Sequence, residues 1–242
     1  MEPHYAKDLS RDALGSLKRL HEDKGGWQQR KSEFTQHQLL EATVTCIVRF
    51  GFARVRTRDI AEEAGLSRGA IVHHFANKRQ LFEKALEYVF LSRIEEFRAA
   101  IENLPTMEAR AAHGLDVYWE QLQSPYFVAV QELQMAARSN PALAAIMKPQ
   151  RERFMAQWRN EAARLFPEWS STGPMFDLVM MLTRYLMEGM ALQSWFEPDA
   201  RRENELLTYL KLRLSDMRDA RDLPGSDMAV EGYLALRPDG AL

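Results

Sequence analysis

Residues 57–75 read TRDIAEEAGLSRGAIVHHF, and this stretch decides the class of fold. It predicts two short helices around a turn at Gly65, because glycine readily adopts the left-handed conformation that ends a helix. Ser67 stands where a side chain can cap the second helix. The apolar residues that would lock the two helices together are Ile60, Ala61, Ala64, Leu66, Ile71 and Phe75. The pattern is that of a helix-turn-helix, which projects its second helix into the major groove of DNA.

The outward face of the second helix carries residues suited to DNA. With the apolar set turned inward, the outward positions are Arg68, Gly69, Ala70, Val72, His73 and His74. The fork of Arg68 matches the O6 and N7 atoms of guanine, and Ala70 or Val72 can touch a thymine methyl group. Gly69 leaves room for a close approach to the bases. The side chains placed to donate hydrogen bonds to phosphates are His73, His74 and Lys78.

Basic residues gather around this motif. Between Arg30 and Phe82 the chain has nine Lys and Arg against five Asp and Glu, whereas acidic residues outnumber basic ones, 34 to 32, over the whole length. A basic region on an acidic body indicates one end that faces a polyanion. The adjacent His73 and His74 do not predict a metal site, because neighbours on a helix point about 100° apart. We therefore expect no metal and no cofactor.

The composition is that of an ordinary globular protein, with 46% hydrophobic and 27% charged residues among 242. Cys46 is the only cysteine, so no disulfide within the chain is expected and a reducing cytoplasm fits best. Residues 1–10 lack the apolar run of a secretory signal. The most apolar window, residues 176–192, is too short and too charged to cross a bilayer. We expect a cytoplasmic protein without membrane contact.

Apolar residues recur at helical spacing almost throughout, so an all-α fold is predicted. Helices are expected to end at Gly51 and Gly65, and a longer helix to run from after Asn77 to about Asn103. Further helices are expected at about 107–122, 125–138, 141–147, 149–166, 174–196 and 202–218, several of them starting near a proline.

The predicted domains follow from these elements. The first is an N-terminal DNA-binding domain over 33–82, a three-helix helix-turn-helix domain with its motif at about 56–75. It is followed by an α-helical ligand-binding and dimerisation domain over 83–218. An N-terminal extension over 1–32 and a C-terminal tail over 219–242 flank them. The basic residues of the extension fit either an arm that enters a minor groove or a flexible solvated leader.

The motif resembles that of the TetR family of transcriptional regulators. The matching positions are Gly51-Phe52, Asp59-Ile60-Ala61, Ala64-Gly65-Leu66-Ser67, Gly69, His74-Phe75 and Lys78. The match covers about residues 37–85, and the remainder matches only as an all-α part of the expected length. The resemblance implies that Thr57 and Ser67 meet phosphates at two helix starts and that residues 68–70 lie nearest the bases.

Motif and resemblance together predict a set of DNA-binding residues. They are Arg56, Thr57, Arg58, Ser67, Arg68, Gly69, Ala70, Val72, His73, His74 and Lys78. Two positions depart from the family pattern. Arg56 stands where the family commonly has a small hydroxyl residue, so a charge contact replaces a cap there. Val72 stands where the family favours a tyrosine, so that the tyrosine's backbone contact is either lost or replaced by apolar contact with DNA.

Large soft side chains between residues 107 and 196 indicate a cavity. Methionine adapts to sites of variable occupancy, and polar groups such as Thr183 and Arg184 are scattered through the same helices. A mainly apolar pocket with a few polar anchors is the usual ligand site, and the family resemblance implies an inducer there. The ligand-binding residues expected are Trp119, Phe127, Met135, Phe154, Trp158, Met181 and Tyr185.

The helix expected from Pro174 is apolar on more than one face, which indicates burial on both sides. With the last helix it is the best candidate for a homodimer interface. The interface residues expected are Leu178, Leu182, Leu186, Gly189, Met190, Leu206 and Leu210. A twofold axis would set two recognition helices about 34–36 Å apart, one turn of DNA.

These observations predict a ligand-responsive transcriptional regulator. We expect a repressor that binds a palindromic operator as a dimer and is released when a small, largely apolar or amphipathic inducer shifts the helix that begins near Lys78. The alternative is an α-helical small-molecule-binding protein, or an enzyme, that uses the cavity without DNA. An enzyme is not expected, because no nucleophile–base pair, phosphate-binding glycine loop or carboxylate pair stands at useful spacing.

Overall fold

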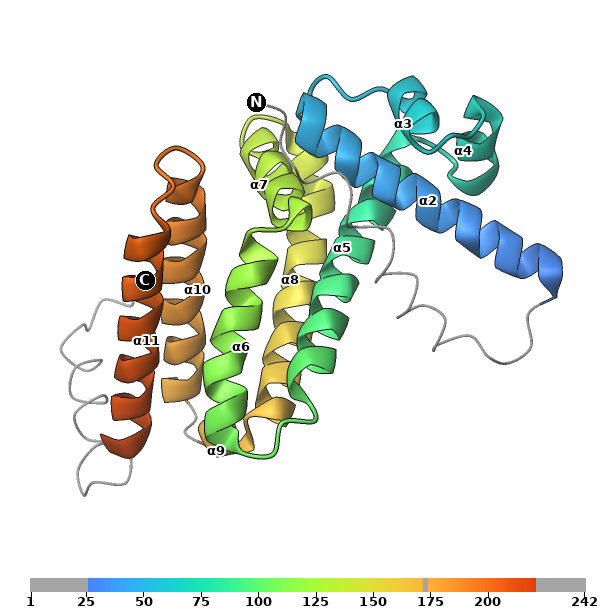
Figure 1. Ribbon diagram of the computed structural model, residues 1–242. Helices are drawn as coiled ribbons and strands as arrows, with labels where there is room; N and C mark the ends of the chain where they lie inside the picture. The colour runs from blue at the N-terminus through green and yellow to red at the C-terminus, as the bar shows by residue number, and fades with distance from the viewer. Residues whose placement is uncertain (1–25, 172–173, 221–242) are drawn as a thin grey trace. The chain divides into compact units, whose positions relative to one another are not determined.

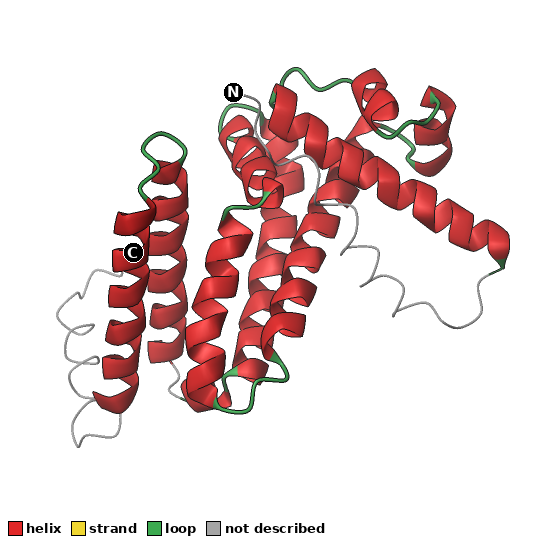
Figure 2. Ribbon diagram, in the orientation of Figure 1, coloured by secondary structure: helices red, strands yellow, loops and turns green. Residues whose placement is uncertain are grey.

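The computed structural model describes residues 26–171 and 174–220, and every regular element within these ranges is a helix (Figures 1 and 2). In chain order the helices are α2 (Trp27–Phe50), α3 (Thr57–Glu63), α4 (Arg68–His74), α5 (Lys78–Ile101), α6 (Met107–Leu122), α7 (Pro125–Ala137), α8 (Pro141–Leu165), α9 (Pro167–Ser170), α10 (Pro174–Ser194) and α11 (Ala200–Ala220). This confirms the predicted all-α fold. None of these helices, over the residues described, is apolar enough for long enough to span a membrane.

The two ends of the chain are described only in part. Residues 1–25 and 221–242, which hold most of the predicted N-terminal extension and C-terminal tail, lie outside the described residues. Residues 27–32 of that extension form the first turns of α2.

Local capping explains where several helices begin. At the start of α6 the Thr106 hydroxyl accepts a hydrogen bond from the Ala109 N–H at 3.1 Å. At the start of α8 the Asn140 side chain accepts one from the Leu143 N–H at 3.1 Å. α7 begins with Pro125, whose missing N–H costs nothing in a first turn. The helix starts predicted at 107, 125, 141 and 174 are confirmed.

α8 corrects the prediction of separate helices at 141–147 and 149–166, because it runs through Pro149 without a break. Pro149 has no N–H to donate to the Ala145 carbonyl, and a proline inside a helix costs about 3 kcal/mol or more. Both residues are exposed, so water can hydrate the carbonyl that lacks its helical partner. The short α9 after α8 was not predicted.

Contacts divide the chain into two compact units, and α5 and α8 contribute residues to both. The first unit takes residues up to Phe90 together with Ser124–Arg151. The second takes Leu91–Gln123 together with residues from Glu152 onward. In the first unit α2 packs against α3 and α7. Its fully buried side chains include Leu39, Ile47, Ile60, Leu81 and Phe127.

A polar cluster lies inside the first unit, on residues of α2, α5 and α7. The hydroxyls of Tyr88 and Tyr126 both donate to Oε1 of Glu41, that of Tyr126 at 2.6 Å. Because the Tyr88 proton is directed at Glu41, the Nε2–H of His37 is the donor in its 3.0 Å contact with the Tyr88 hydroxyl. Burial lowers the pKa of His37 despite the nearby charge of Glu41, so its ring is neutral at neutral pH. The carboxylate is thus held by two phenol donors.

In the second unit α6 packs against α10 and α11, and these two helices run side by side in opposite directions (Figure 1). Gly114 on α6 permits close packing, because a Cβ there would lie 3.4 Å from both Phe97 and Phe166. Lys211 on α11 forms an ion pair with Asp116 on α6 at 2.5 Å. The helices of this unit enclose the cavity described below.

Replacing Tyr126 by Phe should lower the free energy of unfolding by about 1–3 kcal/mol, because Glu41 loses one of its two hydroxyl donors. Urea unfolding followed by circular dichroism measures the change. Thr35→Val is the control. Among the described residues the Thr35 hydroxyl makes one solvent-exposed hydrogen bond, to the Lys31 carbonyl on its own helix, so this variant should change the value by less than about 0.5 kcal/mol. Equal losses in the two variants would contradict a stabilising role of the Tyr126–Glu41 bond.

Candidate nucleic-acid interface and ligand cavity

The turn between α3 and α4 is fixed by the main chain. Gly65 has a positive φ of 64°, the Leu66 N–H donates to the Ala61 carbonyl at 2.9 Å, and the Gly65 N–H donates to the Glu62 carbonyl at 3.0 Å. These two bonds form the Schellman arrangement that ends a helix. The buried members of the predicted apolar set are Ile60, Ala61, Ile71 and Phe75. The helix-turn-helix predicted from the sequence is present.

α3 begins at Thr57 although no hydroxyl caps it. The N–H of Arg56, the residue before the helix, donates to Oδ2 of Asp59 at 3.0 Å, so a carboxylate in the first turn closes the start. Sequence reasoning missed this role of Asp59, whose signal was an acidic residue three positions after the cap. Arg58 lies 3.7 Å from both Asp59 and Glu62, so this predicted DNA-binding residue takes part in ion pairs on its own helix.

α4 presents its outward residues to solvent. Val72 is 77% exposed, a large value for an apolar side chain. Arg68 and Gly69 are exposed as well, and no carboxylate within the described residues pairs with Arg68. Ser67 occupies the cap position but makes no side-chain cap hydrogen bond, which corrects the expectation that it caps α4. The Ser67 hydroxyl is therefore not committed to the helix.

The histidine pair at the end of α4 is in edge-to-face contact, with ring centroids 5.0 Å apart. His73 is exposed and His74 is half-buried. Burial, followed by the charge of His73, lowers the pKa of His74. A neutral imidazole still has one N–H, so His74 can donate one hydrogen bond at neutral pH.

Lys78, at the first position of α5, has an internal contact that the sequence did not reveal. Its ammonium donates to the carbonyl of buried Val55 at 2.7 Å, and burial lowers the pKa of Lys78. An ammonium has three N–H donors, so two remain for another acceptor. Asn77 caps the start of α5 by accepting from the Gln80 N–H at 2.9 Å. The Lys78–Val55 hydrogen bond thus connects the start of α5 to the loop before α3.

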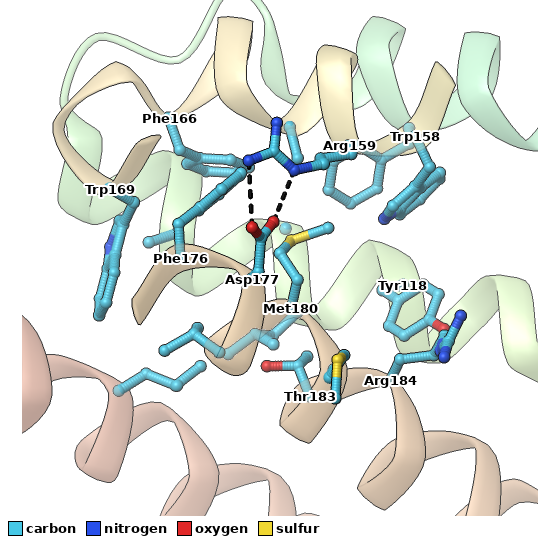
Figure 3. A pocket seen from close by; sticks show the side chains of 18 of the residues that line it. Tyr118, Trp158, Arg159, Phe166, Trp169, Phe176, Asp177, Met180, Thr183 and Arg184 are labelled. Carbon is cyan, nitrogen blue, oxygen red and sulfur yellow. Dashed lines mark hydrogen bonds and ion pairs between the residues drawn. The ribbon is translucent and has the colours of Figure 1, made fainter. Parts of the chain in front are cut away.

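The second unit contains a cavity of about 650 Å³, within the usual range for small-molecule sites. Residues of α5, α6, α8, α9, α10 and α11 line it. Its aromatic walls are Phe97, Tyr118, Trp158, Phe166, Trp169 and Phe176 (Figure 3). Most of the remaining wall is alanine, leucine, valine and methionine. This arrangement suits a largely apolar ligand.

Charged groups stand at separate places in the wall. Arg159 on α8 donates to both carboxylate oxygens of Asp177 on α10, at 2.6 and 3.1 Å (Figure 3). Glu108 and Lys211 also line the cavity, and Lys211 is paired with Asp116. Arg184 on α10 is the remaining cation of the wall.

Two of the seven predicted ligand-binding residues, Trp158 and Met181, line this cavity. The other five do not; they are Trp119, Phe127, Met135, Phe154 and Tyr185. Phe127 is fully buried in the first unit, and Met135, also in that unit, is exposed. Sequence reasoning missed most of the aromatic wall, although Thr183 and Arg184 were recognised as polar groups of this region.

The predicted dimer residues separate into two groups. Those left exposed on α10 and α11 are Leu178, Leu182, Gly189 and Leu206, and Leu186 is half-buried. Met190 and Leu210 are buried within the chain's own core. Tyr185, 57% exposed, lies on the same face of α10 as Leu178 and Leu182. A Cβ added to Gly189 would meet nothing within 4 Å. One face of this helix pair is thus apolar and open.

The described residues hold no group of three or more His, Cys, Asp or Glu side chains placed to bind a metal ion. Neither the helix-turn-helix nor the cavity walls therefore offer such a cluster within these ranges.

Comparison with known proteins identifies the N-terminal region. Residues 39–85 match the family model of the bacterial regulatory proteins of the tetR family. The HTH-type transcriptional regulator Rv2912c of Mycobacterium tuberculosis is 22% identical over 188 residues, which cover 78% of this chain and 96% of that protein. The HTH-type transcriptional regulator YfiR of Bacillus subtilis is 28% identical over 165 residues, covering 67% and 68% of the two chains.

The fold has close counterparts among solved structures. A transcriptional regulator from Pseudomonas aeruginosa PAO1 superposes with a TM-score of 0.61 at 21% identity, covering 84% of this chain and 95% of the other. A TetR-family regulator from a Rhodococcus species superposes with a TM-score of 0.58 at 23% identity, covering 75% and 96%. The helix-turn-helix of residues 39–85 is thus similar to that of the tetR family of bacterial regulatory proteins, and the all-helical chain has the fold of solved regulators of that family.

Proposed function

We propose that this DNA-binding regulator is a homodimeric repressor that reads a palindromic operator through α4 and leaves it when a small amphipathic molecule occupies the cavity. The observation that supports it best is the outward face of α4, where Arg68, which pairs with no carboxylate of the described residues, stands beside exposed Val72. Facing a major groove, the guanidinium can bind guanine and the valine can cover a thymine methyl.

The phosphate contacts are divided between the two helix starts and the end of α4. Thr57 and Ser67 stand at the starts of α3 and α4, and His73 and His74 stand at the end of α4. Arg56 and Arg58 add positive charge near the start of α3. Phosphate contacts fix the register of the motif on DNA, whereas contacts from α4 select the sequence.

Dimerisation through α10 and α11 would cover their open apolar face. Soluble chains rarely leave a contiguous apolar patch uncovered, and Leu178, Leu182 and Tyr185 recur at the spacing of one helix face. Gly189 on the same face lets a helix of a second copy approach closely. A twofold arrangement would supply the pair of α4 helices that a palindrome requires.

The response to a ligand would pass along α5. This helix contributes Phe97 to the cavity wall, and its first residue, Lys78, bonds to Val55 before α3. A ligand that favours one position of α5 would therefore change the population of the DNA-binding arrangement, by as much as its affinity differs between the two states.

Replacing Arg68 by Ala should weaken binding to an operator selected from random-sequence DNA by about 5- to 150-fold, equivalent to about 1–3 kcal/mol for a bidentate base contact. Binding to unselected DNA should change much less. Fluorescence anisotropy at fixed low salt measures both affinities. Arg201→Ala removes an exposed arginine far along the chain, at the start of α11, and serves as the control. A similar loss on both DNAs would assign Arg68 to phosphate instead of to a base.

Lys78→Met should lower the free energy of unfolding by about 0.5–1.5 kcal/mol, because the Val55 carbonyl loses its donor. It should also weaken binding to all DNA sequences alike. Urea unfolding and anisotropy report the two effects separately. Lys84→Met is the control. Among the described residues Lys84 forms one ion pair, with Glu87 on the surface of the same helix, so stability should change by less than about 0.5 kcal/mol. Weaker DNA binding with unchanged stability would show that Lys78 acts on phosphate alone.

Leu182→Glu should convert the dimer to a species of 28.0 kDa, the mass of one chain, because a carboxylate would be buried in an apolar interface. Light scattering coupled to size-exclusion chromatography measures the mass. Gln157→Glu introduces the same charge at an exposed position of α8 and should leave a dimer. If Leu182→Glu remains dimeric, the interface lies elsewhere.

A further inference from the structure

One cation in the cavity lining forms no ion pair with a carboxylate of the described residues. The lining includes Arg159, Arg184 and Lys211 as cations, with Asp177 and Glu108 as anions. Arg159 and Asp177 neutralise each other through two hydrogen bonds, and Lys211 is paired with Asp116. Among the described residues this leaves Arg184 as the lining cation without an ion pair, so its position decides where the cavity can receive an anionic ligand.

Arg184 has few partners for its five N–H groups. Within the described residues its hydrogen-bond partner is the thioether sulfur of Met155, a weak acceptor. Its Nε is buried and has no hydrogen-bond partner. Its guanidinium also lies 4.6 Å from the ring centre of Tyr185. A half-buried guanidinium held only by a thioether and a ring face is under-satisfied and favours an anionic acceptor.

A second guanidinium increases the positive potential at the same place. Arg93 is only 3% exposed, and it lies 5.9 Å from the ring centre of Tyr118, a residue of the cavity wall. The Tyr118 hydroxyl is hydrogen-bonded to Arg93 and feels the charges of Arg93, Glu188 and Arg184. Glu188 is thus the one carboxylate among these neighbours of Tyr118, against two arginines.

Tyr118 adds a neutral donor beside Arg184. Burial, its largest influence, raises the pKa of Tyr118 to about 12, so the hydroxyl keeps its proton at neutral pH. Arg93 has no lone pair and is the donor in its bond with Tyr118. The Tyr118 proton therefore stays available to an acceptor. Figure 3 shows Tyr118 and Arg184 together on one side of the cavity, away from the Arg159–Asp177 pair.

The one lining carboxylate not paired with Arg159 stands at the other end. Glu108 is in the first turn of α6, ten positions before Tyr118 on the same helix, or about 15 Å along its axis. The rest of the lining is mainly aromatic and aliphatic, apart from Thr183, Ser215 and the ion-paired Arg159, Asp177 and Lys211. The cavity thus has a cationic end, at Arg184 and Tyr118, and an apolar body that continues toward Phe166, Trp169 and Phe176.

We propose that the effector of this protein is an amphipathic carboxylate, whose acid group binds Arg184 and Tyr118 and whose apolar part lies against the aromatic wall. The inference rests on the proposed function, because it names the class of molecule that the cavity takes. A carboxylate accepts charge-assisted hydrogen bonds from the guanidinium and the phenol. A neutral alcohol would leave the guanidinium charge unpaired, and an ammonium would add a second positive charge.

Matched probes test the headgroup directly. Decanoate, decan-1-ol and decyltrimethylammonium share one chain, and 4-butylbenzoate with 4-butylbenzyl alcohol form an aromatic pair. Isothermal titration of the 242-residue chain with each probe, below micelle formation, measures affinity without DNA. In at least one set the carboxylate should bind at least about tenfold more tightly than its alcohol, the scale of a hydrogen bond to a charged group.

Variants then assign the preference to Arg184. Arg184→Met should weaken carboxylate binding at least about tenfold and alcohol binding less than about threefold. Arg184→Lys, which keeps the charge but loses the fork, should fall between. Arg201→Met removes an arginine outside the cavity and should change neither affinity. Thermal unfolding of each variant reports whether it is folded, and the headgroup comparison on the unaltered protein does not depend on any variant.

The outcomes separate this inference from the proposed function. Equal binding of carboxylate and alcohol, a preference for the ammonium, or an unchanged preference in Arg184→Met overturns the carboxylate inference while the cavity remains a ligand site. Absence of binding by every probe overturns the inference as well. If the carboxylate binds as expected but leaves operator affinity unchanged, the inference stands and the proposed release from DNA is wrong.

Discussion

The left-handed backbone at Gly65 is the constraint on which the DNA-facing surface depends. It allows two main-chain N–H groups to return to the last carbonyls of α3, so the chain reverses in a few residues without help from any side chain. Ile71 and Phe75 can then pack against Ile60, and the opposite face of α4 is left to solvent. A residue with a Cβ would cost about 1 kcal/mol or more in this conformation. Because the turn is held by backbone, the outward residues of α4 are free to differ in order to suit an operator.

Most of the fold was predictable because its determinants are local. Gly65, Asn77, Thr106 and Pro125 act on groups within a few residues, and each marks a helix boundary that the structure contains. Pro149 misled the prediction because its local preference is outweighed by packing. Leu143, Ile146, Gln150 and Phe154 form one buried stripe that continues past the proline. Burial of that stripe keeps α8 in one piece, and no short window of sequence contains this information.

The two candidate sites also differ in how far apart their residues lie in the sequence. The face of α4 comes from seven consecutive residues, so helical periodicity was enough to find it. The cavity is assembled from six helices between Phe97 and Ser215, and composition alone cannot show which aromatic residues meet. Phe127 and Phe154 have the side chains expected of a pocket wall, yet both are buried in the hydrophobic core. The lack of an ion pair at Arg184 among the described residues was also invisible in the sequence, because it depends on where the carboxylates of other helices lie.

Pro149 also affects the bending stiffness of α8. The boundary between the two compact units crosses α8 between Arg151 and Glu152, within one turn of the proline. A helix that lacks one of its internal hydrogen bonds resists bending less at that point, and prolines are the commonest sites of helix kinks. α5, the other helix that contributes to both units, has no proline between Lys78 and Ile101. Of the two helices that contribute to both units, α8 thus has a point of lower bending stiffness near the boundary, whereas α5 keeps an unbroken ladder of main-chain donors.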